Sequence, residues 1–107
     1  MKIKEYKNLA EAIDGTIKRD KDYILLKHSL GKGTEIKTHF HKRANEFIVI
    51  DSGKLIIKLG KEEKLFNLKN KAVSILFPKQ RVHSLLAISP ITYFVIRDKK
   101  DISIYKK

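Results

Sequence analysis

The 107-residue chain is long enough for one domain with one modest hydrophobic core, and we expect a single domain over residues 1–107. It contains no cysteine, which excludes a disulfide framework and thiolate chemistry and fits a cytoplasmic protein. Apolar runs reach only about five residues, so we expect neither a signal peptide nor a membrane span.

The formal net charge of +12 raises the question of an anionic partner. Twenty lysines stand against four arginines, in blocks no longer than two residues, and fifteen isoleucines accompany them. That composition is typical of an AT-rich genome, whereas proteins that read nucleic acids carry arginines at the base-reading positions. Nucleic acid is therefore the less favoured partner, and binding of an anionic polymer through the basic surface remains an alternative.

Residues 8–14, NLAEAID, predict one short helical turn near the N-terminus. Asn8 is a favourable N-cap residue, and Glu11 stands at the capping-box position three residues later. We expect Gly15 to end the turn.

After residue 22 the sequence alternates between short apolar runs and turn signals, a pattern typical of strands. The predicted strands are residues 23–30, 35–40, 46–50, 54–59, 63–68, 72–77, 81–88, 92–97 and 102–105. Gly53 and Gly60 fall in tight turns that call for positive φ. Nine short strands without a long helix predict an antiparallel sandwich or barrel.

Two of the four histidines lie two residues apart, His39 in the predicted strand 35–40 and His41 directly after it. Residues two apart in a strand share a face, and a turn at 42–45 would open an antiparallel neighbour with Glu46 beside them. A fourth group would come from His83 in a later strand. Three imidazoles and a carboxylate are typical of a transition-metal site. A histidine pair at this spacing is also common on polar surfaces, so the spacing alone leaves both interpretations open.

The same residues resemble the first cupin motif. That motif is glycine, five residues, His-x-His, three or four residues, glutamate, six residues and glycine. The matching positions are Gly33, His39, His41, Glu46 and Gly53, with four residues before the glutamate.

The second cupin motif is matched in part. Pro78 and His83 stand at its proline and histidine positions. Ala72 and Gln80 replace its two glycines, and Ala87 replaces its asparagine. Gln80 is the departure with a structural consequence, because glycine tolerates positive φ better in the turn before the histidine.

The resemblance spans residues 33 to 87 and implies an all-β fold, the cupin double-stranded β-helix or jelly-roll barrel, with at most a short N-terminal helical turn. It also implies that the open mouth of the barrel holds one divalent transition metal, for which Fe, Mn, Ni, Zn and Cu all suit the donors. The implied ligands are His39, His41, Glu46 and His83.

Cupins host many chemistries, so the fold leaves the function open. One hypothesis is a metal-dependent isomerase, lyase or dioxygenase that acts on a small polar ligand of anionic or sugar-like character. The alternative is a non-enzymatic cupin that binds or senses such a ligand.

Strand alternation suggests residues that bind this ligand. If His83 faces inward, Arg81 does too, and its guanidinium suits a carboxylate or phosphate. A rim arginine that faces solvent is the competing interpretation. Lys37 shares the predicted face of His39 and His41 and is the second candidate.

As a strand, residues 54–59, KLIIKL, would present apolar side chains on both faces, so both faces should be covered by other parts of the protein or by a second copy. Together with the resemblance to small cupins, this predicts a homodimer.

Overall fold

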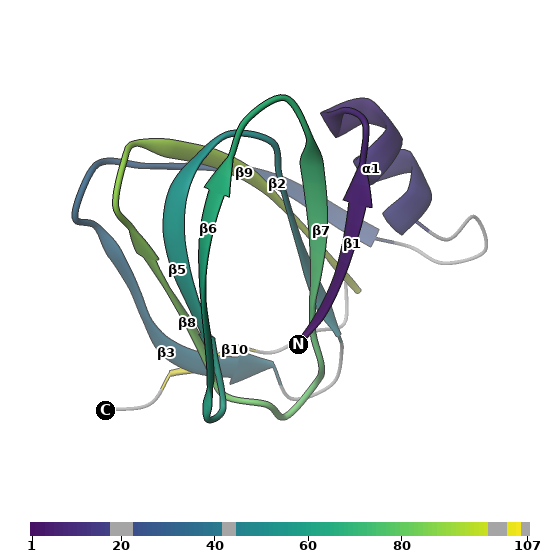
Figure 1. Ribbon diagram of the computed structural model, residues 1–107. Helices are drawn as coiled ribbons and strands as arrows, with labels where there is room; N and C mark the ends of the chain where they lie inside the picture. Colours follow the sequence, from purple (N-terminus) through teal and green to yellow (C-terminus); the bar gives the residue numbers. More distant parts are fainter. Residues whose placement is uncertain (18–22, 42–44, 99–102, 106–107) are drawn as a thin grey trace.

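Two five-stranded antiparallel sheets face each other in the computed structural model, which describes residues 1–17, 23–41, 45–98 and 103–105 (Figure 1). The first sheet has the strand order β1-β7-β4-β9-β2, and the second has the order β10-β3-β8-β5-β6. The strands are β1 (Lys2–Tyr6), β2 (Tyr23–Leu30), β3 (Glu35–His41), β4 (Glu46–Ile50), β5 (Gly53–Leu59), β6 (Glu62–Leu68), β7 (Ala72–Phe77), β8 (His83–Ala87), β9 (Ile91–Asp98) and β10 (Ser103–Tyr105).

Strand alternation builds the core between the sheets. On β5, Leu55, Ile57 and Leu59 are at most 1 % exposed, whereas Lys54 and Lys58 are exposed. Each fully buried aliphatic side chain of this kind stabilises the fold by about 1.5–3 kcal/mol. The two inner faces therefore hold the barrel closed.

Helix α1 (Leu9–Thr16) packs on the outer face of the first sheet, against β1, β4 and β7 (Figure 1). The backbone N–H of Glu11 donates to Asn8 Oδ1 at 2.9 Å, so the predicted N-cap is confirmed. Ala12 of the helix and Val49 of β4 belong to the same buried cluster. The helix has eight residues, about two turns, and is longer than the sequence predicted.

The prediction that Gly15 ends the helix is wrong, because α1 continues to Thr16. Gly15 has another role. A Cβ at this position would lie 2.7 Å from Cε1 of Tyr6, closer than two carbon atoms approach. Glycine therefore allows the ring of Tyr6 on β1 to pack against the helix.

All nine predicted strands are present, with ends within two residues of the prediction. Gly53 and Gly60 have φ values of 102° and 57°, as the turns required. The additional strand is β1, which pairs with β7 at the edge of the first sheet. Its sequence, KIKEY, is rich in charge, and lysines on an edge strand discourage pairing with another chain.

The outer face of the second sheet carries an apolar row. Ile56 pairs with Leu65 on β6 and with Leu86 on β8, so the three side chains share a face. Leu65 is 53 % exposed, and the other two are half-buried. Helix α1 packs against strands of the first sheet and leaves this row uncovered.

None of the helical segments in the described ranges has the length and apolar character that a bilayer crossing requires.

Candidate metal centre and cavity

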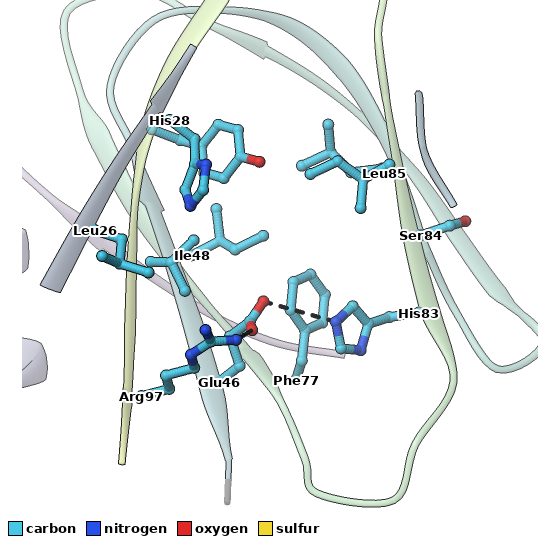
Figure 2. A pocket seen from close by; sticks show the side chains of 12 residues that line it. Leu26, His28, Glu46, Ile48, Phe77, His83, Ser84, Leu85 and Arg97 are labelled. Atoms are coloured by element: carbon cyan, nitrogen blue, oxygen red, sulfur yellow. Dashed lines mark ion pairs between the residues drawn. The ribbon is translucent and has the colours of Figure 1, made fainter. Parts of the chain in front are cut away.

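A cavity of about 160 Å³ lies between the two sheets (Figure 2). Its wall is apolar along most of its length, with Ile48 and Val95 from the first sheet and Leu85 from the second. Leu26 and His28 line it from β2, the edge strand of the first sheet. Both are exposed, Leu26 by 37 %, so the cavity reaches the surface beside β2.

The charged end of the cavity consists of Glu46, His83 and Arg97 (Figure 2). Glu46 Oε1 lies 3.6 Å from His83 Nε2, and Glu46 Oε2 lies 3.8 Å from Arg97 Nη1. Glu46 and Arg97 are register partners on β4 and β9, whereas His83 opens β8 in the opposite sheet. Glu46 and His83 are almost fully buried, and a quarter of the Arg97 side chain is exposed.

The imidazole of His83 is held on two sides. Its ring stacks on Phe77, with 4.3 Å between centroids and 8° between planes. Its Nδ1 lies 3.2 Å from the carbonyl oxygen of Arg81. A carbonyl only accepts hydrogen bonds, so Nδ1 carries the proton and donates. In a neutral imidazole, Nε2, which lies 3.6 Å from Glu46 Oε1, then carries the lone pair, as in a metal-binding histidine whose other nitrogen is anchored.

The turn before His83 forms without the glycine of the second cupin motif. The N–H of Arg81 donates to the carbonyl of Pro78 at 3.2 Å, and Gln80 between them adopts a φ of 64°. Gln80 therefore takes the left-handed conformation that the motif assigns to glycine. A residue with a side chain takes this conformation at a cost of about 1–2 kcal/mol.

The backbone of β3 places the two remaining predicted ligands near this end of the barrel. His39 is the register partner of His83, and His41 is the register partner of Ser103 on β10. The side chains of 37–41 lie outside the described residues. Among the side chains that the structure does describe, no group of three or more potential metal ligands occurs. The four-ligand set therefore stays a prediction.

The sequence predicted β3 and β4 to be antiparallel neighbours, and this is wrong. The neighbours of β3 are β8 and β10, and those of β4 are β7 and β9. Because both edges of each strand are already paired, the two strands lie in opposite sheets. Glu46 reaches the site from across the barrel, and His83, not Glu46, is on a strand adjacent to β3.

Arg81 does not line the cavity. It is exposed, and a Cβ placed on Gly60 would lie 3.1 Å from its Nη2. Strand β8 begins at His83, so the alternation used to place Arg81 inward does not extend to it. The arginine at the cavity is Arg97, and a role for Arg81 in ligand binding stays a prediction.

The alternation used for Lys37 is also interrupted. Ile36 pairs with Leu85 and His39 with His83, so β3 has one residue more than β8 over this stretch. This is a β-bulge, which changes the phase of the strand. Ile36 lines the cavity, and the side chain of Lys37 lies outside the described residues.

Arg97, His28 and Tyr93 also line the cavity, and none of the three was among the predicted site residues. The rings of His28 and Tyr93 stack, with 5.6 Å between centroids, on neighbouring strands. A usable signal existed on β9, where Tyr93, Val95 and Arg97 share one parity and Tyr93 and Val95 are buried. His28 shares a face of β2 with Leu26, which also lines the cavity, but YILLKHSL carries apolar residues on both faces, so the sequence does not show which face points inward.

No protein-family model matches the chain, and no curated protein does. Solved structures of similar fold include a conserved protein of unknown function from Streptococcus pyogenes, with a TM-score of 0.62, 23 % identity and coverage of 78 % of this chain and 70 % of that one. A protein with a double-stranded β-helix domain from Klebsiella pneumoniae has a TM-score of 0.65, 14 % identity and coverage of 81 % and 76 %. A sugar phosphate isomerase of the cupin superfamily from Silicibacter pomeroyi has a TM-score of 0.66, 16 % identity and coverage of 90 % and 62 %.

The chain therefore has the double-stranded β-helix fold of the cupins, as its first motif predicted. At these identities the likeness establishes the fold, and the chain spans less than two thirds of the isomerase.

Proposed function

We propose that this protein is a cytoplasmic, metal-binding cupin that holds one divalent transition metal and binds or acts on a small polar, anionic ligand beside it. The proposed metal ligands are His39, His41, Glu46 and His83. The observation that carries the proposal is the meeting of Glu46 and His83 at the buried end of the cavity.

The spacing of these two groups supports the proposal. Two metal bonds of about 2.1 Å separate their donor atoms by about 3.0 Å at the octahedral angle, which leaves positions open for a ligand, and by about 3.4 Å at the tetrahedral angle. Glu46 Oε1 and His83 Nε2 are 3.6 Å apart, which is long for a hydrogen bond and requires only a small approach for both to bind one metal ion. The register of β3 against β8, with His39 opposite His83, agrees with a shared site.

A bound metal would supply a Lewis acid for an isomerase, lyase or dioxygenase reaction. The chain's own contribution would be to anchor His83 through the Arg81 carbonyl and to exclude water with the apolar wall. The isomerase from Silicibacter pomeroyi makes sugar phosphates one class of compound to test. The alternative is a non-enzymatic cupin in which the same site holds a ligand without turnover.

Metal analysis tests the proposal directly. Protein prepared without oxygen and without chelators should retain about one equivalent of a divalent metal, and the chelated protein should take it up again. His83→Ala should lose this binding, whereas His28→Ala should keep it, because His28 lies at the mouth of the same cavity and is not a proposed ligand. Equal binding by both variants, or no metal in the wild type, contradicts the proposal.

The basic surface is tested separately. Binding of an anionic polymer that falls steeply with salt and is unchanged in His83→Ala would favour the polymer-binding alternative.

A further inference from the structure

The volume of the cavity limits the size of its ligand. Cavities of about 150 Å³ in protein interiors accept benzene, which has six carbon atoms. The cavity here has about 160 Å³, so the enclosed part of a ligand has about six non-hydrogen atoms. A hexose phosphate is more than twice that size.

The two ends of the cavity differ in polarity (Figure 2). Arg97, Glu46 and His83 lie together at one end, and Leu85 and His28 lie at the other. Ser84 points away from the space that the other side chains surround. The wall that joins the ends is aliphatic and belongs to the buried core; its members include Ile48, Leu85 and Val95, which are 3–6 % exposed.

This wall selects against polyhydroxylated ligands. A hydroxyl group that enters an apolar site without a hydrogen-bond partner loses its hydration and gains nothing in return. Beyond the charged end, the described polar side chains facing the cavity are those of His28 and Tyr93. A sugar would bring several hydroxyl groups against the aliphatic wall, whereas an alkyl group would contact it favourably.

Arg97 supplies the complementary charge at the other end. Its guanidinium carries five N–H donors in a planar fork, so it can serve Glu46 and a second carboxylate together. Three quarters of its side chain is shielded from solvent, which strengthens such an interaction relative to a surface pair.

We propose that the cavity binds a small aliphatic carboxylate of about six non-hydrogen atoms. Its carboxylate lies against Arg97 beside the proposed metal site, and its alkyl part lies against Ile48, Leu85 and Val95. The inference rests on the proposed function for the position of the site, and it names the ligand class. It does not require the metal, because Arg97 is part of the chain.

Ligand titrations followed by NMR test this inference in the chelated protein and after addition of one equivalent of Zn²⁺. The probes are butyrate, the neutral isostere butyramide, and glucose 6-phosphate. We expect butyrate to shift the resonances of Leu85, Val95 and Arg97, butyramide to bind at least about tenfold more weakly, and glucose 6-phosphate to leave these resonances unchanged.

Arg97→Gln should weaken butyrate binding about tenfold or more, whereas Lys54→Gln, which removes an equal charge on the exposed face of β5, should leave it unchanged. Leu85→Phe is a second variant that fills the apolar end without altering a charge, and it should also abolish binding. Thermal unfolding of each variant checks that it is folded. The resonance shifts in the wild-type protein test the site even if one of the variants is unfolded.

The inference is overturned if butyrate shifts no cavity resonance in either form, if butyramide or glucose 6-phosphate binds as tightly as butyrate, or if Lys54→Gln loses as much affinity as Arg97→Gln. Metal content is measured on the same samples. Butyrate binding without any metal uptake would leave this inference standing and refute the proposed metal site, and metal uptake without butyrate binding would do the reverse.

Discussion

The imidazole of His83 lies 3.6 Å from the carboxylate of Glu46, although the two residues open strands in opposite sheets. Each is buried, and each is the first residue of its strand, β8 and β4 respectively. Both residues are held by the backbone pairing of their strands, and both side chains line the cavity between the sheets. This position combines a rigid support with access for a ligand.

Replacing His83 is expected to remove metal binding. His83→Ala should lower the affinity for a divalent metal by at least about 100-fold, because the loss of a supporting residue alone costs 10–100-fold. Competition with a chromophoric chelator measures this affinity. His28→Ala serves as the matched control, and an equal loss in both variants would show that His83 is not a ligand.

Gln80→Gly is expected to stabilise the protein. Gln80 has a φ of 64°, and glycine adopts this conformation without the steric cost of a Cβ. After allowance for the greater freedom of glycine in the unfolded chain, we expect a gain of about 1 kcal/mol, or about 5 °C in Tm. Lys79→Gly is the control, since Lys79 does not have a positive φ, and it should destabilise. A Tm that falls in Gln80→Gly would contradict this account of the turn.

The two glycines that bracket the first cupin motif should differ in their tolerance of alanine. At Gly53, φ is 102°, and a Cβ would lie 2.6 Å from Cγ2 of Ile91, so Gly53→Ala should cost about 3 kcal/mol. At Gly33, φ is 80° and no atom lies within 4 Å, so Gly33→Ala should cost about 1–2 kcal/mol. Urea unfolding measures both, and the same cost at both sites would show that crowding at Gly53 is relieved by movement.

The carboxyl of Glu5 should titrate below its usual range. Lys71 Nζ donates to Glu5 Oε1 at 2.9 Å, and this hydrogen bond and the lysine's charge lower the pKa of Glu5. A lowered folded-state pKa contributes stability above the unfolded-state pKa, and this contribution is lost as pH falls through the folded-state value. Carboxyl NMR titration should show the pKa rise toward its ordinary value in Lys71→Gln and stay unchanged in Lys69→Gln. An unchanged pKa in Lys71→Gln would mean that the pair does not form in solution.

Leu65→Lys is expected to disrupt the predicted homodimer. Leu65 is 53 % exposed in the apolar row with Ile56 and Leu86, and a charge there would be buried by a second copy. Light scattering at micromolar concentration should report a dimer for the wild type and a monomer for the variant. Leu25→Lys, at a leucine of the first sheet that is 46 % exposed, should remain dimeric. A monomeric wild type would refute the prediction.

Much of the fold could be predicted because its signals are local. Runs of β-branched and aromatic residues marked the strands from β2 to β10, and the glycine, histidine and glutamate spacing of the first motif identified the barrel. β1 was missed because three of its five residues are charged, and its place depends on pairing with β7. Gly15 was misread because its closest neighbour, Tyr6, is brought to it by the tertiary fold.

The site was harder to predict because it depends on which strands meet. Sequence spacing placed Glu46 beside β3, but hydrogen-bond partners are non-local, and β4 belongs to the other sheet. Strand alternation, extended backward from His83, predicted that Arg81 faces the cavity, but β8 begins only at His83. Arg97 occupies the position that Arg81 was expected to take, and its parity with buried Tyr93 was readable on its own strand.

The extra residue of β3 has a consequence for how related sequences should be compared. On a regular strand, residues 36 and 39 would point to opposite faces because they are three positions apart. Only one of them could then pair with an inner-face residue of β8. Because Leu85 and His83 are two residues apart on β8, a one-residue deletion between positions 36 and 39 would remove the bulge and let both pairs form in a regular ladder. That deletion would shorten the five-residue spacing between Gly33 and His39, so related sequences with four residues there are expected to have a regular β3 without the bulge.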